Sequence, residues 1–118
     1  MAGRNVTYLS EANMITCVLQ TGLAEDVLDA AKNCGAQGAT ISYGRGTGIR
    51  ERMGLLGVTI DEQKEVIRII VSEEQADRVF EAMYLAGGLD TPGKGIMFMT
   101  KLDRVATYIP ESVLKEIA

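Results

Sequence analysis

The chain has 118 residues, 47% of them hydrophobic and 24% charged, a composition typical of one globular domain and not of a disordered chain. Its formal net charge of −4 argues against nucleic-acid binding, because affinity for a duplex comes mainly from clustered cations that contact phosphates. The chain has no histidine and only two cysteines, Cys17 and Cys34, so histidine-dependent nucleophiles are excluded and a zinc site is not expected.

Nothing in the sequence predicts export or insertion into a membrane. Residues 1–12 lack the apolar core of a signal peptide and are expected to form an N-terminal extension. The longest apolar runs are far shorter than the roughly 20 residues that a helix needs to cross a bilayer. Both cysteines fall in apolar patterns without a CxxC pair, so we expect buried, reduced thiols in a cytoplasmic protein.

The first half of the chain predicts a strand, a helix and a second strand. Residues 14–19 (MITCVL) form a short apolar run rich in β-branched side chains, which is typical of a strand. Thr21 and Gly22 then precede a helix whose apolar residues recur every three or four positions and which ends at Gly35. Residues 39–43 (ATISY) predict the second strand.

The second half of the chain repeats this pattern. Residues 65–71 (EVIRIIV) predict a strand. Ser72 and Gln75 form a capping box, in which Ser72 accepts a hydrogen bond from the Gln75 amide and the Gln75 side chain reaches back. Gly87 ends the helix that follows, and residues 96–102 predict the last strand. The buried stripe of this second helix is expected to be Ala76, Val79, Phe80 and Met83.

The two halves are equal in length from the strand start to the helix-ending glycine, and this symmetry predicts a doubled βαβ unit. We therefore expect an α+β, ferredoxin-like βαββαβ domain over residues 13–110. It would have a four-stranded antiparallel sheet, two helices on one face and a long loop between its second and third strands. Residues 111–118 are expected to form a C-terminal tail.

A glycine-rich loop, residues 87–95, connects the second helix to the last strand. It comes close to the Walker A motif, G-x4-G-K-[ST]. However, Gly95 stands where the motif needs Ser or Thr, and the loop leads from a helix into a strand, which argues against a P-loop hydrolase. Successive backbone amides and Lys94 could still hold a phosphate group. The alternative is a plain turn with a solvated lysine.

The long loop, residues 44–64, opens with glycines that alternate with other residues and then carries cations. Its first residues, 44–48 (GRGTG), do not match a dinucleotide fingerprint, but Arg45, Arg50 and Arg52 suit phosphate or carboxylate groups. A flexible, solvated loop is the alternative. The apolar stretch 53–58 (MGLLGV) is expected to be covered by a partner, by the loop itself or by a neighbouring subunit.

Taken together, these segments resemble the PII signalling superfamily and look closest to its divergent PII-like branch. The resemblance covers about residues 14–110, and the residues that carry it are 35–40 (GAQGAT) leading into 44–48 (GRGTG), 72–75 (SEEQ) and 90–96 (DTPGKGI). It implies a non-enzymatic homotrimer that binds adenine nucleotides in the clefts between subunits. From the residues present, neither a metal site nor a cofactor is expected. The long loop would be the T-loop, which docks on a regulated transporter or enzyme, and the glycine-rich loop would wrap the phosphates.

By family position, the resemblance implies two sets of binding residues. The first set would contact the nucleotide and comprises Gly38, Thr40, Gly46, Thr47, Gly48, Arg68, Gly93, Lys94 and Gly95. The second set belongs to the T-loop, would contact the partner protein and comprises Arg50, Arg52, Met53, Leu55 and Leu56.

The sequence also departs from the family pattern. Residues 105–109 (VATYI) carry no cation where the family has basic residues for the distal phosphates, so AMP or ADP is expected to be favoured over ATP. Residues 44–64 contain no tyrosine that could be uridylylated, and Arg68 stands where the family has a glutamate that helps to hold adenine. The alternative function is a structural or interaction trimer with a degenerate nucleotide site; a nucleotide hydrolase is the least supported.

Overall fold

The computed structural model describes residue 6, residues 8–46 and residues 62–108. Within these residues, no helix is long and apolar enough to span a membrane. In chain order the elements are β1 (Tyr8–Leu9), β2 (Ala12–Gln20), α1 (Ala24–Asn33), β3 (Thr40–Gly46), β4 (Glu62–Ser72), α3 (Glu73–Ala86), β5 (Gly95–Leu102) and β6 (Val105–Ala106).

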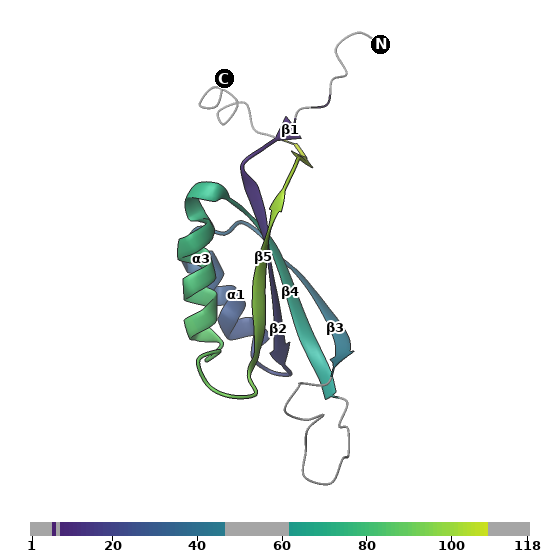
Figure 1. Ribbon diagram of the computed structural model, residues 1–118, viewed down its shortest axis with the longest axis vertical. Helices are drawn as coiled ribbons and strands as arrows, with labels where there is room; N and C mark the ends of the chain where they lie inside the picture. Colours follow the sequence, from purple (N-terminus) through teal and green to yellow (C-terminus); the bar gives the residue numbers. More distant parts are fainter. Residues whose placement is uncertain (1–5, 7, 47–61, 109–118) are drawn as a thin grey trace.

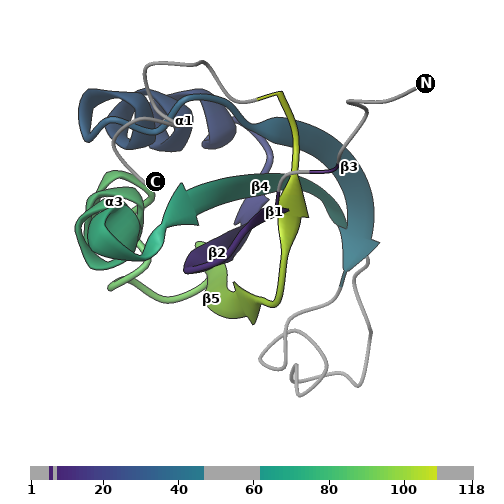
Figure 2. The same ribbon diagram turned by 90° about the horizontal axis from the view of Figure 1, so that it is seen from above.

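Four of the strands form one antiparallel sheet in the order β3-β4-β2-β5. Figures 1 and 2 show both helices on one side of this sheet. The order and the strand directions confirm the predicted ferredoxin-like fold with a four-stranded antiparallel sheet and two helices on one face. The long central strands β2 and β4 also extend beyond their predicted bounds at both ends.

The helix face of the sheet holds the hydrophobic core. Side chains alternate between the two faces of a strand, and the register places Ile15 opposite Ile69 and Cys17 opposite Ile67. Each buried large aliphatic side chain contributes about 1.5–3 kcal/mol relative to an exposed one, so this face supplies much of the folding free energy. The core that the strands form with the helices comprises Ile15, Cys17, Leu19, Ala24, Val27, Ala31, Ala36, Ile67, Ile69, Val71, Ala76, Val79 and Met83.

The opposite face of the sheet, which we call the open face, is covered by neither helix (Figure 2). Large apolar side chains remain exposed there: Ile70 is 51% exposed, Phe98 48% and Ile96 61%. By strand alternation and register, the open face also carries a polar group of side chains in its centre. That group comprises Thr16 of β2, Thr40 and Ser42 of β3, and Arg68 of β4.

The two helices begin in different ways. Ser72 caps α3, and its hydroxyl accepts from the Gln75 backbone amide at 3.3 Å, as the capping box predicts. The Gln75 side chain, in contrast, donates to the carbonyl of Gly35 at 3.4 Å and so ties α3 to the end of α1. Helix α1 has no capping side chain at Leu23. Instead, the buried carboxylate of Glu65 on β4 accepts hydrogen bonds from the amides of Gly22 and Ala24.

A small two-stranded sheet of β1 and β6 was not expected from the sequence. It pairs Tyr8 with Ala106 and Leu9 with Val105, and it lies beyond the helices at the top of Figure 1. The guanidinium of Arg104 lies 4.9 Å from the centre of the Tyr8 ring, which is within the range of a cation–π interaction. Part of the predicted N-terminal extension is therefore an ordered strand.

The cysteines are both free, in agreement with the prediction. Cys17 is fully buried among the core residues, whereas Cys34 at the end of α1 is only partly buried. Burial disfavours the thiolate and raises the pKa of Cys17 to about 12, so this thiol stays protonated and unreactive in the folded protein.

Candidate functional site

The glycine-rich loop connects α3 to β5 through a sequence of tight turns. The backbone amide and hydroxyl of Thr91 both donate to the Gly88 carbonyl, at 2.9 and 2.5 Å. Gly88 and Gly93 have φ values of +64° and +80°, which glycine adopts without strain. A Cβ atom at Gly95 would lie 2.2 Å from the carbonyl oxygen of Val18, so this position excludes any side chain. The residue that breaks the Walker A motif is thus required by the packing of β5 against β2.

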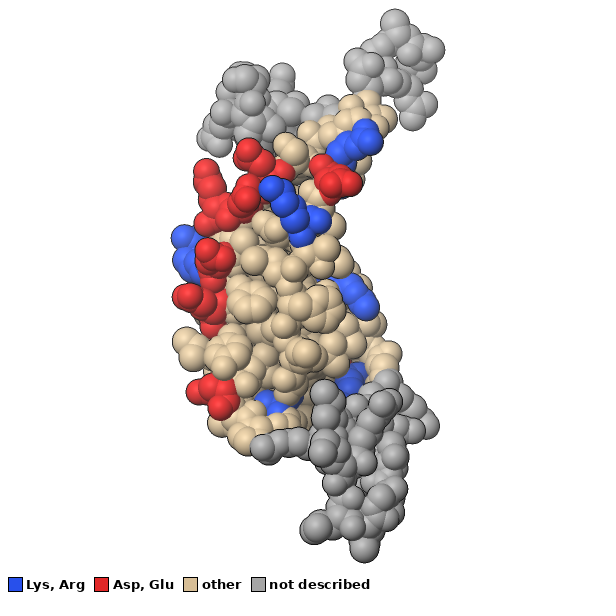
Figure 3. Space-filling model, in the orientation of Figure 1, with Lys and Arg blue, Asp and Glu red and all other residues tan. Residues whose placement is uncertain are grey.

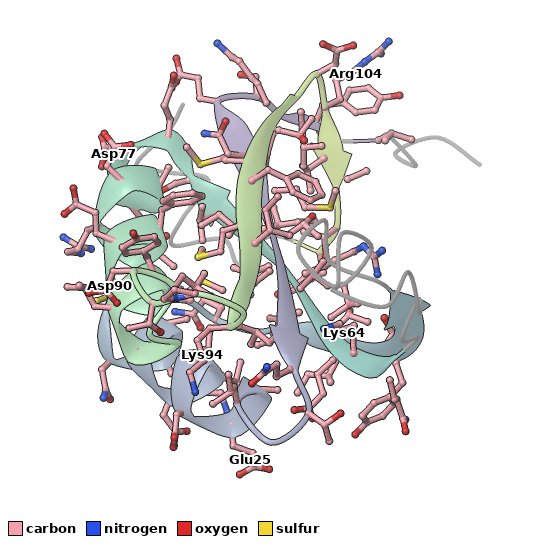
Figure 4. The ribbon with its side chains drawn as sticks, turned by 60° about the horizontal axis from the view of Figure 1, so that its bottom comes forward. Glu25, Lys64, Asp77, Asp90, Lys94 and Arg104 are labelled. Atoms are coloured by element: carbon pink, nitrogen blue, oxygen red, sulfur yellow. The ribbon has the colours of Figure 1, made fainter. Side chains whose placement is uncertain are left out.

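The backbone of this loop is anchored to the end of β2. The Lys94 carbonyl accepts from the Gln20 amide at 3.1 Å, and the Lys94 side chain is half-buried. Lys94 is thereby held at the lower end of the sheet in Figure 4. A cation held beside a glycine-rich backbone suits a phosphate group better than a lysine on a mobile turn would.

The base of the long loop lies at the same end of the sheet. Gly46, the last residue of β3, pairs with Glu62, the first residue of β4. The hydroxyl of Thr21 donates to the Gln63 carbonyl at 2.9 Å. Because Gln20 holds the glycine-rich loop and the adjacent Thr21 holds β4, the turn between β2 and α1 connects the two loops.

Sequence reasoning missed this turn as a part of the site. The sequence pattern predicts only a helix start at Thr21 and Gly22, and it assigns no role to Gln20 or Glu65. The one available signal was Glu65, a lone carboxylate at a strand position that faces the core. Such a buried charge needs hydrogen-bond donors, and it finds them in the amides of Gly22 and Ala24.

A second group of predicted site residues lies toward the other end of β3. Thr40, its first residue, stands directly opposite Arg68 of β4. A guanidinium nitrogen of Arg68 donates to the Ser42 hydroxyl at 3.3 Å, so these side chains share the open face. Gly38 precedes this strand, and a Cβ there would meet no atom within 4 Å.

One chain does not bring these two groups together. Thr40 and Gly46 are the two ends of β3 and lie about 20 Å apart at about 3.3 Å per residue. The glycine-rich loop runs into β5 and Gly46 belongs to β3, the two outer strands of the sheet. At about 4.8 Å per strand spacing these strands are roughly 14 Å apart. A site that uses every described residue of the predicted set therefore needs more than one copy of the chain.

The remaining predicted residues lie outside the described part of the chain. These are Thr47 and Gly48 of the nucleotide set and the whole T-loop set, namely Arg50, Arg52, Met53, Leu55 and Leu56.

The charges of the described residues are distributed unevenly. Figure 3 shows acidic side chains gathered along the edge formed by α3, and α1 adds Glu25, Asp26 and Asp29. Three cations, Lys64, Arg68 and Lys94, lie on the strands and the glycine-rich loop, whereas on the helices the cations Lys32 and Arg78 lie among more numerous acids. No group of His, Cys, Asp and Glu in the described ranges could hold a metal ion. The sheet side of the molecule is thus the side that suits an anionic ligand.

Comparison with known proteins places the chain among signalling proteins. The family model of nitrogen regulatory protein P-II matches residues 12–111. Arabidopsis thaliana PII bound to citrate is 19% identical, with a TM-score of 0.61 over 80% of this chain and 79% of that chain. The B. subtilis GlnK–ATP complex is 20% identical, with a TM-score of 0.64 over 80% of this chain and 84% of that chain. No curated protein matches the chain by sequence.

Proposed function

Because the chain belongs to the nitrogen regulatory protein P-II family, we propose that it is a cytoplasmic, non-enzymatic signal-transduction protein that binds an adenine nucleotide between the subunits of a homotrimer. Nucleotide occupancy would select one conformation of the T-loop, which then regulates a transporter or an enzyme. The relatives of the same fold include one described in complex with ATP. A ligand can shift such an equilibrium only if it prefers one conformation of the loop.

The observation that carries this proposal is that the turn between β2 and α1 is hydrogen-bonded both to the glycine-rich loop and to β4 at the base of the long loop. Gln20 and Thr21 hold the two loops at one end of the sheet, where the Lys94 side chain is half-buried. Phosphates bound by the backbone of residues 93–95 would therefore lie at the end of the sheet from which the T-loop leaves. Phosphate binding could therefore affect the conformation of the T-loop through the contacts of residues 20 and 21.

The homotrimer is supported by the open face and by the separation of the site residues. Exposed Ile70, Ile96 and Phe98 form an apolar surface that a neighbouring copy can cover. A cleft between copies would place Thr40 and Arg68 of one subunit near the glycine-rich loop of another, which a single chain does not do. The nucleotide would then bridge two subunits.

The proposed preference for AMP or ADP over ATP rests on the lack of cations in the last described residues, 105–108. Residues 105–108 carry no cation, and Val105 and Ala106 pair with β1 in the small sheet. Lys94 is then the cation that the glycine-rich loop brings to the phosphates. One cation in this loop matches one or two phosphates better than three, because each further phosphate adds negative charge that the loop itself does not pair.

The test is a thermal unfolding panel on the full chain with AMP, ADP and ATP, combined with light scattering. We expect a trimer that ADP or AMP stabilises more than ATP does. A ligand at 100 times its Kd should add about 2.7 kcal/mol. Lys94→Gln should weaken ADP binding about tenfold, whereas Lys101→Gln, a control with the same charge change at an exposed site, should not. If all nucleotides leave the trimer unchanged, the protein is instead an interaction trimer with a degenerate site.

A further inference from the structure

Arg68 is a cation in the middle of an otherwise uncharged part of the open face. The register places it between Thr40 on β3 and Thr16 on β2. Among the described residues its hydrogen-bond partner is the Ser42 hydroxyl, to which one guanidinium nitrogen donates at 3.3 Å. A guanidinium has five N–H donors and accepts no hydrogen bond, so most of its donors remain available to another group.

The described part of the chain provides no carboxylate for Arg68. The salt bridge found among the described residues joins Lys101 to Glu73 at 3.9 Å, away from this side chain. The exposed acids of α1 and α3 belong to the helix layer, which lies on the other side of the sheet (Figure 2), and Asp90 and Asp103 lie in the turns before and after β5. Glu65 also faces that side, where the start of α1 satisfies it.

In a threefold assembly, the free-energy cost of leaving Arg68 without an acidic partner would be larger, because the open face would be shielded from water. If open faces turn toward one another, as the proposed function requires, the acids of the helix layer turn outward and cannot reach Arg68 of a neighbour. Burying a cation without a partner costs several kcal/mol. The apolar residues beside it, Val66 and Ile70, offer the guanidinium no hydrogen-bond acceptor on their side chains. Within its own subunit the guanidinium has no carboxylate partner among the described side chains, so a covered site at Arg68 favours an anion.

We propose that Arg68, together with the hydroxyls of Thr40 and Ser42, binds an oxyanion on the open face at the junction of β3 and β4. The fork of the guanidinium matches two oxygens of a carboxylate or phosphate group, and the two hydroxyls can donate to the same oxygens. This inference rests on the proposed trimer, because coverage of the open face is what excludes water from the site. It extends the nucleotide proposal by assigning Arg68 to an anion and not to the purine ring.

The experiment is an isothermal titration of the full chain with sodium phosphate and with sodium acetate, against sodium chloride at equal ionic strength. Light scattering on the same samples gives the assembly state. We expect saturable binding of one oxyanion per chain, weakened at least tenfold in Arg68→Gln and several-fold in Ser42→Ala. Arg68→Lys keeps the charge but loses the fork, so it should fall between these variants and the unaltered chain. Lys101→Gln should bind as the unaltered chain does.

A repeat at saturating ADP identifies the source of the anion. If ADP abolishes oxyanion binding and Arg68→Gln also weakens ADP, the site holds a phosphate of the nucleotide. If both bind together, the site takes a separate small anion. A trimeric Arg68→Gln variant that binds phosphate and acetate like the unaltered chain overturns the inference and leaves the proposed function intact. A chain that remains monomeric overturns both.

Discussion

The two faces of the central sheet are completed in different ways. On the helix face, Ile69 is 1% exposed and is covered by the protein's own helices. On the open face its neighbour in sequence, Ile70, is 51% exposed. Two adjacent residues of β4 thus differ in kind: the chain's own helices bury the first, whereas the second stays exposed unless another molecule covers it. From this difference we infer that side chains on the helix face stabilise the folded chain, whereas side chains on the open face serve assembly and ligand binding.

The largest expected effect tests this division directly with two adjacent isoleucines. Ile69→Ala leaves a cavity in the core, so the free energy of unfolding should fall by about 2–5 kcal/mol. Ile70→Ala removes the same atoms from the open face and should weaken the trimer while each subunit remains folded. Urea unfolding, followed by circular dichroism, and light scattering at several concentrations measure the two effects. Equal losses of folding stability in both variants would contradict the proposed division.

The next effect compares two glycines at opposite edges of the sheet. Gly95→Ala would place a Cβ 2.2 Å from the Val18 carbonyl oxygen, whereas a Cβ at Gly44 meets nothing within 4 Å. We expect Gly95→Ala to lower unfolding stability by about 1–3 kcal/mol or more, because backbone must move at the start of β5. Gly44→Ala should change it by less than about 1 kcal/mol. Thermal unfolding of both variants measures this, and a stable Gly95→Ala protein would show that the loop can shift.

The third effect concerns the helix face alone and is the pH dependence of unfolding stability that arises from the buried thiol of Cys17. Burial raises the pKa of Cys17 from 9.0 to about 12, so above pH 9 the unfolded chain loses a proton that the folded chain retains. Stability from this thiol is therefore complete below pH 9 and declines between pH 9 and 12, by about 1.4 kcal/mol per pH unit. Urea unfolding at pH 8 and pH 10 should show this decline in the unaltered chain and a smaller one in Cys17→Ala. Identical declines would mean that the thiol does not contribute.

The comparison of the two faces also explains how far the sequence could predict the structure. Alternating and periodic apolar residues are local signals, and they identified both helices, the four main strands and the ferredoxin-like order. The true extent of β4 was missed, because residues 62–64 (EQK) are polar and form strand only through pairing with β3. The strands β1 and β6 have two residues each and join the two ends of the described chain, so they carry no periodic signal.

The site was predictable to a smaller extent than the fold. Glycines mark the turns of the glycine-rich loop, and Gly88 and Gly93 indeed have positive φ. The contacts that position this loop join Gln20 to Lys94 and Thr21 to Gln63, which are far apart in the sequence. No local pattern reveals such contacts, because they depend on which strands become neighbours. The ligand contacts of the predicted residues remain predictions for the experiments above.

The smallest expected effect concerns Glu65, a polar residue on the face that otherwise encodes folding. Its carboxylate accepts from the amides of Gly22 and Ala24 at the start of α1, where a negative charge is favourable. Glu65→Gln keeps an acceptor oxygen but loses the charge and buries an amide group, so unfolding stability should fall by about 1 kcal/mol. Glu81→Gln, at an exposed position of α3, is the matched control and should change stability little. Because the turn that Glu65 holds also contacts both loops, ADP affinity measured by titration should fall together with stability in Glu65→Gln. Unchanged ADP affinity in the destabilised variant would confine Glu65 to folding and separate this turn from the ligand site.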